Sequence, residues 1–575
     1  MVRVLSPSQA ATIMQAQSSA RRRRQLTVLF VSGWLVQVLI RLWFARTRTW
    51  PAANPDETGY MLAARWLAGG PGADLSGNTF YQGGYPLLLT PAYWLSHDPA
   101  TVYTLVMVTN AMVGALAFPL AYLALRRLGT GRRAAVTMGW AAPLLPASTF
   151  FGAYALTDAV LPVIVLGWVL ALDRFVRRGD GWTAAGASLI ACYAAAVHTR
   201  GTVLVCVHAA ALLVVLARRG RRLTALLGAV TTAGGFSAVM TFHGLVQANL
   251  YPEGVRDLGN NLEIRLTTLD GQLWAISGAI GQLWYLTVST WGLAGLGLVA
   301  LVATLAGRRT GFEERLMAGV VLAATVGVAY ISSAALGDEH RVGNFAYGRY
   351  LACLALVPTL AGLAFLLRSD LRRQIMAAAG AAAVTAGSGL WVALYAGERL
   401  RTHHFIGFDF PETSFLAADR AALHLTTASL SALGLLAGLL ALRRLHEFAP
   451  AAGLLAISLA AMTFIVGTGM KRVTPDPPVQ LPAGGRVAID RSLAWGVRII
   501  LLYPVWWTRL ERFDSRTTRP DPEVCTVIVN RPAGTEPAAS WPGRPAGWTA
   551  TAGESWGTHW VTWRAPSCPA EGTLP

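Results

Sequence analysis

The chain has 575 residues, of which 54% are hydrophobic and only 14% are charged. So much apolar sequence excludes an ordinary soluble protein. The net charge of +18 raises the question of a nucleic-acid partner, but the charge is not gathered on one segment. Segments between alternate apolar runs hold 24 Arg and 6 acidic residues, whereas the intervening segments up to residue 420 hold 12 Arg and 15 acidic residues. This is the positive-inside pattern of membrane proteins, so we expect the excess charge to face anionic membrane lipid and no nucleic acid.

Long apolar runs predict an all-α polytopic membrane protein. A run of about 20 apolar residues spans a bilayer as a helix, and the lipid cannot satisfy the backbone in any open structure. We expect about thirteen spans, at residues 25–44, 101–125, 134–152, 159–175, 183–198, 202–217, 223–247, 283–306, 316–335, 350–367, 375–396, 425–442 and 450–469.

The arginine pattern also predicts the topology. The N-terminus is expected in the cytoplasm, and thirteen spans place the C-terminus outside a plasma membrane. We expect a disordered cytoplasmic leader at residues 1–24, a transmembrane domain at 25–470 and a small extracytoplasmic α/β domain at 471–575. Within the last domain, residues 486–490, 525–530 and 556–563 are predicted strands and 492–502 a helix.

Cys525 and Cys568 both fall in this outer domain. An oxidising exterior would allow them to form a disulfide, which would stabilise the domain by about 4 kcal/mol in the chain-entropy model. The other cysteines, Cys192, Cys206 and Cys353, fall within predicted spans and are expected to serve packing.

The first outer segment, residues 45–100, is more than a linker. Residues 56–69 are predicted to form a short helix, and residues 85–95 are too short to span and should lie along the membrane surface. Such elements would frame a groove for a lipid substrate. The side chains expected to line that groove are Tyr60, Tyr81, Tyr85 and, from a later outer loop, His340.

Two adjacent carboxylates, Asp56 and Glu57, follow the first span. One interpretation is a capping box, in which Asn54 is the N-cap, Pro55 opens the helix and Glu57 reaches back. The other is that Asp56 is a general base, which transfer of a sugar to a hydroxyl requires. The two interpretations are compatible, because a capped helix would hold the carboxylate rigidly beside the membrane.

This arrangement resembles the GT-C superfamily of polyprenyl-phosphate-sugar glycosyltransferases, and most of all its protein O-mannosyltransferase and aminoarabinose-transferase branch. The family motifs after the first span match Pro55-Asp56-Glu57 and Tyr85-Pro86-Leu87, and the resemblance extends over about residues 25–370. It implies a GT-C fold, a polyprenyl-phosphate sugar donor and Asp56 as the base.

The resemblance also implies a role for Asp158, which lies at an outer helix junction. It could orient the acceptor with Glu57, or bind a metal with Asp56; alternatively it caps the next helix. Metal dependence differs among GT-C branches, so a divalent metal stays open and no metal ligand is assigned.

Three outer arginines are candidates for binding the donor phosphate: Arg349, Arg341 and Arg200. The planar, permanently charged guanidinium suits phosphate, and charges at membrane level tend to be functional. The alternative is that each is an interfacial anchor or pairs with a loop acid such as Asp338.

We therefore expect an inverting glycosyltransferase on the outer face of the plasma membrane, which glycosylates a hydroxyl of a cell-envelope glycan, glycolipid or glycoprotein. The sequence leaves the sugar and the acceptor open. Two alternatives remain: a transporter or lipid flippase, which would place its binding groups near the bilayer midplane, and a non-catalytic assembly or sensor protein that acts through its outer domain.

Overall fold

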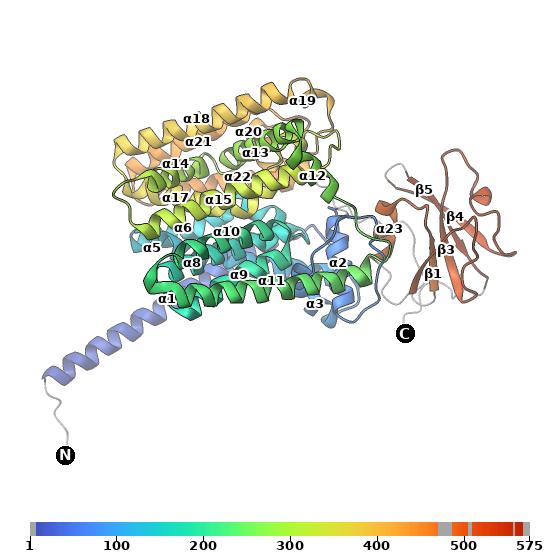
Figure 1. Ribbon diagram of the computed structural model, residues 1–575, viewed down its shortest axis with the longest axis horizontal. Coiled ribbons are helices and arrows are strands. Elements are labelled where there is room, and N and C mark those ends of the chain that lie inside the picture. The colour runs from blue at the N-terminus through green and yellow to red at the C-terminus, as the bar shows by residue number, and fades with distance from the viewer. Residues whose placement is uncertain (1–6, 54, 470–485, 504–508, 556–557, 567–575) are drawn as a thin grey trace, which may run out of the picture.

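A computed structural model describes residues 7–53, 55–469, 486–503, 509–555 and 558–566. It consists of a large helical bundle with a small sheet domain at one end, and the start of α1 projects from the opposite end (Figure 1). The expected fold class, an all-α membrane protein with a small C-terminal α/β domain, is confirmed. The long helices of the bundle are α1 (Pro7–Ala45), α4 (Pro99–Ala115), α5 (Ala117–Arg127), α6 (Arg132–Ala141), α8 (Leu161–Arg178), α9 (Gly181–Val197), α10 (Arg200–Leu216), α11 (Arg222–Leu250), α13 (Leu269–Ser289), α14 (Leu293–Ala306), α15 (Phe312–Ala335), α17 (Arg349–Arg368), α18 (Leu371–Ala396), α21 (Leu425–Leu445) and α22 (Ala449–Gly469).

Short elements connect these helices at the ends of the bundle. They are η1 (Ala142–Leu144), α7 (Pro146–Thr149), η2 (Phe151–Ala153), η3 (Thr157–Ala159), η4 (Arg219–Arg221), α12 (Gly259–Thr267), α16 (Gly343–Ala346), α19 (Arg399–Thr402), η5 (Gly407–Asp409) and α20 (Pro411–Ala417). Several of them, including η3, α16 and η5, carry residues of the candidate site described below.

Each of the thirteen expected spans coincides with a helix or with a bent pair of helices. Within the described residues, eight helices are long and apolar enough to cross a membrane, or up to ten if each bent pair is one span. Helices α9 and α10 are apolar but shorter. The number thirteen therefore stays a prediction.

The expected span at 283–306 is not one continuous helix. Helices α13 and α14 meet at an angle of 116°, because two consecutive residues, Trp291 and Gly292, have the left-handed φ values of 56° and 78°, which no α-helix accommodates. The residues between the expected spans at 223–247 and 283–306 hold α12 and the first turns of α13. A second bend, of 71°, interrupts the expected span at 134–152 before α7.

The leader expected to be disordered is helical from Pro7 onward. Its sequence is rich in alanine and glutamine, which favour helix, and it continues without a break into the first apolar run. The helix that begins in the leader therefore ends only at Ala45.

The first outer segment folds as expected into two short helices, α2 (Asp56–Leu67) and α3 (Gly84–Leu95). The segment that leads into α3 packs closely on α2, because a Cβ on Gly59 of α2 would lie 2.2 Å from the ring of Tyr81. Tyr93 donates a hydrogen bond of 2.8 Å to the carbonyl of Met61, which joins the two helices directly.

The C-terminal domain is a mixed sheet in the order β2-β1-β3-β5-β4. Its strands are β1 (Arg486–Asp490), β2 (Arg509–Phe513), β3 (Val524–Asn530), β4 (Thr549–Ser555) and β5 (Thr558–Arg564), with α23 (Trp495–Leu502) and η6 (Pro537–Ser540). Strand β1 pairs in parallel with β2 and β3, and β5 pairs antiparallel with β3 and β4.

The predicted strands correspond to β1, β3 and β5, and the predicted helix to α23, whereas β2 and β4 were missed. Both missed strands lie at the edges of the sheet, where one side has no partner strand and the apolar pattern is weak. Cys525 is buried in β3. Cys568 lies outside the described residues, so the disulfide stays a prediction.

The sheet domain docks on loops at one end of the bundle through charged contacts. Arg512 lies 2.7 Å from a carboxylate oxygen of Asp74 and 2.6 Å from one of Glu253. Arg498, which is 3% exposed, donates to the carbonyl of Ser76 at 2.6 Å. From the bundle side, the buried Arg65 of α2 donates to the carbonyl of Leu502 at 3.1 Å.

We expect Arg512→Gln to loosen this docking, because it removes the cation shared by two carboxylates. A loss of roughly 1 kcal/mol would speed local opening about fivefold. Hydrogen–deuterium exchange should then rise at residues 73–78 and in α23. Arg516→Gln, at an exposed position of the same domain, removes the same charge and should leave exchange unchanged. Equal exchange in the two variants would contradict the docking contact.

Candidate active site

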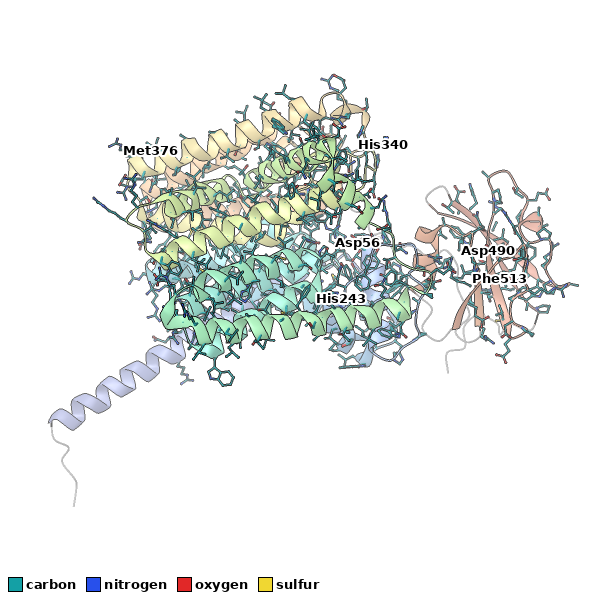
Figure 2. The ribbon with its side chains drawn as sticks, viewed as in Figure 1. Asp56, His243, His340, Met376, Asp490 and Phe513 are labelled. Atoms are coloured by element: carbon teal, nitrogen blue, oxygen red, sulfur yellow. The ribbon has the colours of Figure 1, made fainter. Side chains whose placement is uncertain are left out.

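Asp56 opens α2 at the end of the bundle that faces the sheet domain (Figure 2). Its Oδ2 accepts a hydrogen bond of 3.1 Å from Nη1 of Arg349, the first residue of α17. The Asp56 side chain is 37% exposed, whereas that of Arg349 is only 11% exposed. The expected base is thus held by a buried cation and keeps access to solvent.

Asp158 binds the same arginine from the other side. Its Oδ2 accepts from Nε of Arg349 at 3.0 Å, and its Oδ1 accepts from Arg200 at 2.9 Å. Burial alone would raise the pKa of Asp158, but the guanidinium groups of Arg200 and Arg349 outweigh burial and hold that pKa well below its usual range. Asp158 is therefore a carboxylate at neutral pH.

These four side chains form a network that we call the ion quartet: Asp56, Asp158, Arg200 and Arg349. Two carboxylates face two guanidinium groups, so the charges balance. Arg200 has a side chain that is 4% exposed, and it also donates to the carbonyl of Tyr350 at 3.2 Å. The structure thus brings together residues from four segments that the sequence singled out one by one.

Glu57 points away from this network. It is fully buried, and its carboxylate accepts hydrogen bonds from the backbone N–H groups of Ala52 and Ala53, both at 2.6 Å, and of Ala155 at 2.7 Å. The hydroxyl of Tyr103 donates to it at 2.6 Å. Glu57 does reach back along the chain, as a capping box predicts, while Asn54 lies outside the described residues. All of these contacts are structural, and the substrate role of Glu57 stays a prediction.

The three tyrosines expected in the groove form an aromatic cluster, to which α2 contributes Tyr60. The ring of Tyr60 lies 5.0 Å from that of Tyr81 and 5.5 Å from that of Tyr85. All three are less than 5% exposed, and Tyr85 donates to the side chain of Asn110 at 2.9 Å. Tyr60 belongs to α2, and its contacts with Tyr81 and Tyr85 fix the helix to the segment around α3, so none of the three lines an open surface.

Arg341 and His340 lie in the loop before α16. Arg341 is placed 5.2 Å from the ring centre of Tyr347, whose hydroxyl accepts from Arg349 at 3.4 Å. It is therefore close to the ion quartet without contacting Asp56. His340 is 81% exposed and stacks on His403 at 5.5 Å, at the outer edge of the same end of the bundle (Figure 2).

Sequence reasoning missed Asp409, in η5. This residue is 4% exposed, and its Oδ2 has no hydrogen-bond partner in the described part of the chain. Burial raises the pKa of Asp409 to about 6, although Arg341 and Arg349 oppose the rise. The aromatic and polar character of residues 397–424 was visible in the sequence, but nothing in it marked this one acid.

The rings of Phe151 and Phe408 were also missed. Their centres lie 5.5 Å and 5.8 Å from the guanidinium carbon of Arg349. Aromatic faces attract a cation by their quadrupole, and here they also shield Arg349 from water on that side. Neither ring stood out among the many aromatic residues of the sequence.

The divalent metal that the sequence leaves open stays a prediction. Among the described residues, no group of three His, Cys, Asp or Glu side chains is placed to hold a metal ion. Asp56 and Asp158, the pair considered for this role, are already engaged by arginines.

Solved structures of two bacterial proteins resemble this chain. ArnT from Cupriavidus metallidurans bound to undecaprenyl phosphate matches with a TM-score of 0.54 at 17% identity, over 94% of this chain and 98% of that one. The apo state of the same protein gives a TM-score of 0.52 at 15% identity, with the same coverage. The chain has the GT-C fold.

Arabinosyltransferase EmbB from Mycobacterium smegmatis matches 96% of this chain and 48% of its own, at 14% identity and a TM-score of 0.42, which is too low to support an argument. No family model matches the chain, and no curated protein matches its sequence. The likeness to ArnT thus confirms the fold expected from the family resemblance, and at this identity it establishes the fold alone.

We expect Asp409→Asn to stabilise the protein at pH 8 but not at pH 4. A buried acid whose pKa is raised favours folding while it is protonated, and this contribution is lost as the pH rises through about 6. Removing the ionisable group should therefore add up to about 3 kcal/mol at pH 8. Melting temperatures of both proteins across this pH range test the expectation. Asp270→Asn, at an exposed position, serves as the control, and a gain independent of pH would contradict the assignment.

Proposed function

We propose that this protein is a glycosyltransferase that moves a sugar from a polyprenyl-phosphate carrier to an acceptor hydroxyl on the outer face of the plasma membrane. The observation that carries the proposal is the half-exposed carboxylate of Asp56, fixed by Arg349 at the end of a GT-C bundle. The arginine distribution along the chain supports an outer-face location for this end.

In this proposal Asp56 is the general base. Its Oδ2 is held by Arg349, and its Oδ1 makes no hydrogen bond within the described residues. The acceptor hydroxyl would donate its proton to that free oxygen while it attacks the anomeric carbon. The bond from that carbon to the phosphate oxygen breaks in the same displacement, which inverts the anomeric centre, and the phosphate keeps the electron pair.

Arg349 is the residue best placed to stabilise the leaving phosphate. Its Nε and Nη1 are engaged by Asp158 and Asp56, but Nη2 donates to no group in the described chain. A fixed donor aimed at charge that develops in the transition state is an effective form of catalysis. Arg341, held near Tyr347, is the second candidate for phosphate contact, whereas Arg200 is buried behind Asp158 and supports the network.

The transporter alternative has less support. Two bent helix pairs are present, as in many transporters. However, the charged groups lie at the ends of helices and not midway along them: Asp56 opens α2, Asp158 is in η3 and Arg349 opens α17. This placement suits chemistry at the membrane surface. The sugar and the acceptor remain open, with a cell-envelope glycan, glycolipid or glycoprotein as the acceptor classes.

The test is donor turnover by the full chain in nanodiscs, with a panel of polyprenyl-phosphate sugars and water or added glycans as acceptors. We expect Asp56→Asn to lower turnover at least a hundredfold, as loss of a general base does, while its amide oxygen still accepts from Arg349 and preserves the fold.

The matched control is Asp98→Asn in the same outer segment. Asp98 caps α4 through the N–H of Thr101, and asparagine caps a helix equally well. This variant should turn over at the native rate. Native turnover by Asp56→Asn would remove Asp56 as the base, and no turnover of any donor by the wild type, together with lipid movement across vesicles, would favour the transporter.

A further inference from the structure

A pocket of about 240 Å³ lies on the far side of the aromatic wall that shields Arg349. It sits where the outer ends of α1 and α22 approach η2 and the segment before α21. Two arginines and no acidic side chain line it. The lining residues are Arg48, Phe150, Tyr154, Gly407, Phe408, Pro411, Ser414, Arg420 and Ile465.

Two polar groups of this basic pocket, on Arg420 and Ser414, have no hydrogen-bond partner within the described residues. Arg420 donates through Nη2 to the carbonyls of Phe464 and Ile465 at 2.7 and 2.9 Å, but its buried Nε has no hydrogen-bond partner in the described chain. Ser414 is 4% exposed, and its hydroxyl likewise has no partner among the described residues. Arg48 lies 3.6 Å from the ring centre of Tyr154 and donates to its hydroxyl. The unpaired Nε of Arg420 and the unpaired hydroxyl of Ser414 indicate a missing acceptor.

The basic pocket adjoins the ion quartet. The ring of Phe408 lies 4.9 Å from that of Tyr154, which lines the pocket, and 5.8 Å from the guanidinium carbon of Arg349. One layer of aromatic side chains therefore separates the two sites. Their charges differ: the quartet is balanced, whereas the lining of the pocket carries two cations.

An apolar hollow of about 460 Å³ lies further along the seam between α1 and α22. It is lined by α1 between Leu29 and Val36, by α6, and by the start of α22. From Leu29 to the end of α1 at Ala45 the helix rises roughly 24 Å. This distance exceeds the hydrocarbon thickness of one leaflet, which is half of the ~30 Å core. A lipid with its head in the basic pocket would need a chain longer than an ordinary acyl chain to reach the hollow.

We propose that the basic pocket receives the phosphate of the spent polyprenyl carrier, with its chain along the seam between α1 and α22. This rests on the proposed function. In the transfer, the bond between the anomeric carbon and the phosphate oxygen breaks, the new bond to the acceptor oxygen forms, and Asp56 takes the proton.

The carrier thereby changes from a phosphodiester with a single negative charge to a phosphomonoester whose net charge is about −1.5 to −2. The balanced quartet gains little from that extra charge, but Arg48 and Arg420 match it. The pocket thus favours product over donor, and draws the spent carrier away from Asp56.

The test uses undecaprenyl phosphate as the probe and the full chain in phosphatidylcholine nanodiscs. We expect Arg420→Gln to weaken binding of the probe about tenfold, as loss of a charged hydrogen-bond donor does. Ser414→Ala should weaken it about threefold, and it removes no hydrogen bond of the described chain, so it should fold normally. In turnover assays, the inhibition constant of added probe should rise by the same factors while KM for the donor stays unchanged.

Arg399→Gln is the matched control. Like Arg420, Arg399 donates to carbonyls at the end of a helix and lies beside an aromatic ring, at 5.0 Å from that of Tyr395, but it is remote from the basic pocket. It should bind the probe as the wild type does.

Four results would overturn the proposal: unchanged binding by Arg420→Gln and Ser414→Ala, displacement of the probe by inorganic phosphate alone, equal competition by phosphatidylglycerol, or a parallel rise in donor KM. The binding arm needs no turnover, so its failure is distinguishable from failure of the transferase proposal, which the Asp56→Asn assay decides.

Discussion

The buried ion pairs of Arg349 are the interaction on which the site depends. Burying charge is costly unless each ion is paired and hydrogen-bonded, and the ion quartet meets this condition with Asp56 and Asp158 on either side of Arg349 and with Arg200 behind. The network joins α2, η3, α10 and α17, which are far apart in the sequence. Removal of Asp158 or of either arginine would leave an uncompensated charge in a buried place, so the four segments are held in one arrangement.

The neighbouring carboxylates of Asp56 and Glu57 differ in how they are bound within this arrangement. Glu57 accepts three backbone N–H groups and the hydroxyl of Tyr103, so all of its capacity serves to tie α2 to the loop before it and to the segment after η2. Asp56 is left with one engaged oxygen and partial exposure. The fixed neighbour is what makes the available carboxylate rigid, and a rigid base loses little entropy when a substrate arrives.

Much of this could be predicted from the sequence, in particular whatever depends on local pattern. Apolar runs located most long helices of the bundle, and the motif around Asp56 located α2. Asp158, Arg200 and Arg349 were each singled out by their place at a helix end. That they bind one another could not be predicted, because the pairing of Asp158 with Arg349 joins residues 191 positions apart and depends on how the helices pack.

The failures have similar causes. Asp409 and Phe408 lie in an irregular loop with no periodicity, so only the folded chain shows that the acid is buried and that the ring covers Arg349. The bend at Trp291 results from backbone conformation at a tryptophan, which no propensity predicts. The tyrosines expected to line a groove have hydroxyl groups that suit water, but Tyr60 of α2 is buried with Tyr81 and Tyr85, and their rings pack against one another.

Helix α2 is finally held from both ends, which links the sheet domain to the site. At its start, Asp56 and Glu57 bind the bundle. At its end, Arg65 is 1% exposed and donates to the carbonyls of Leu502 and Tyr503, at the end of α23. A helix of twelve residues is too short to be stable alone, so its position is set by these two attachments. Because a rigid helix transmits displacement along its axis, the docking of the sheet domain constrains the position of the Asp56 carboxylate, the proposed base, without contacting it.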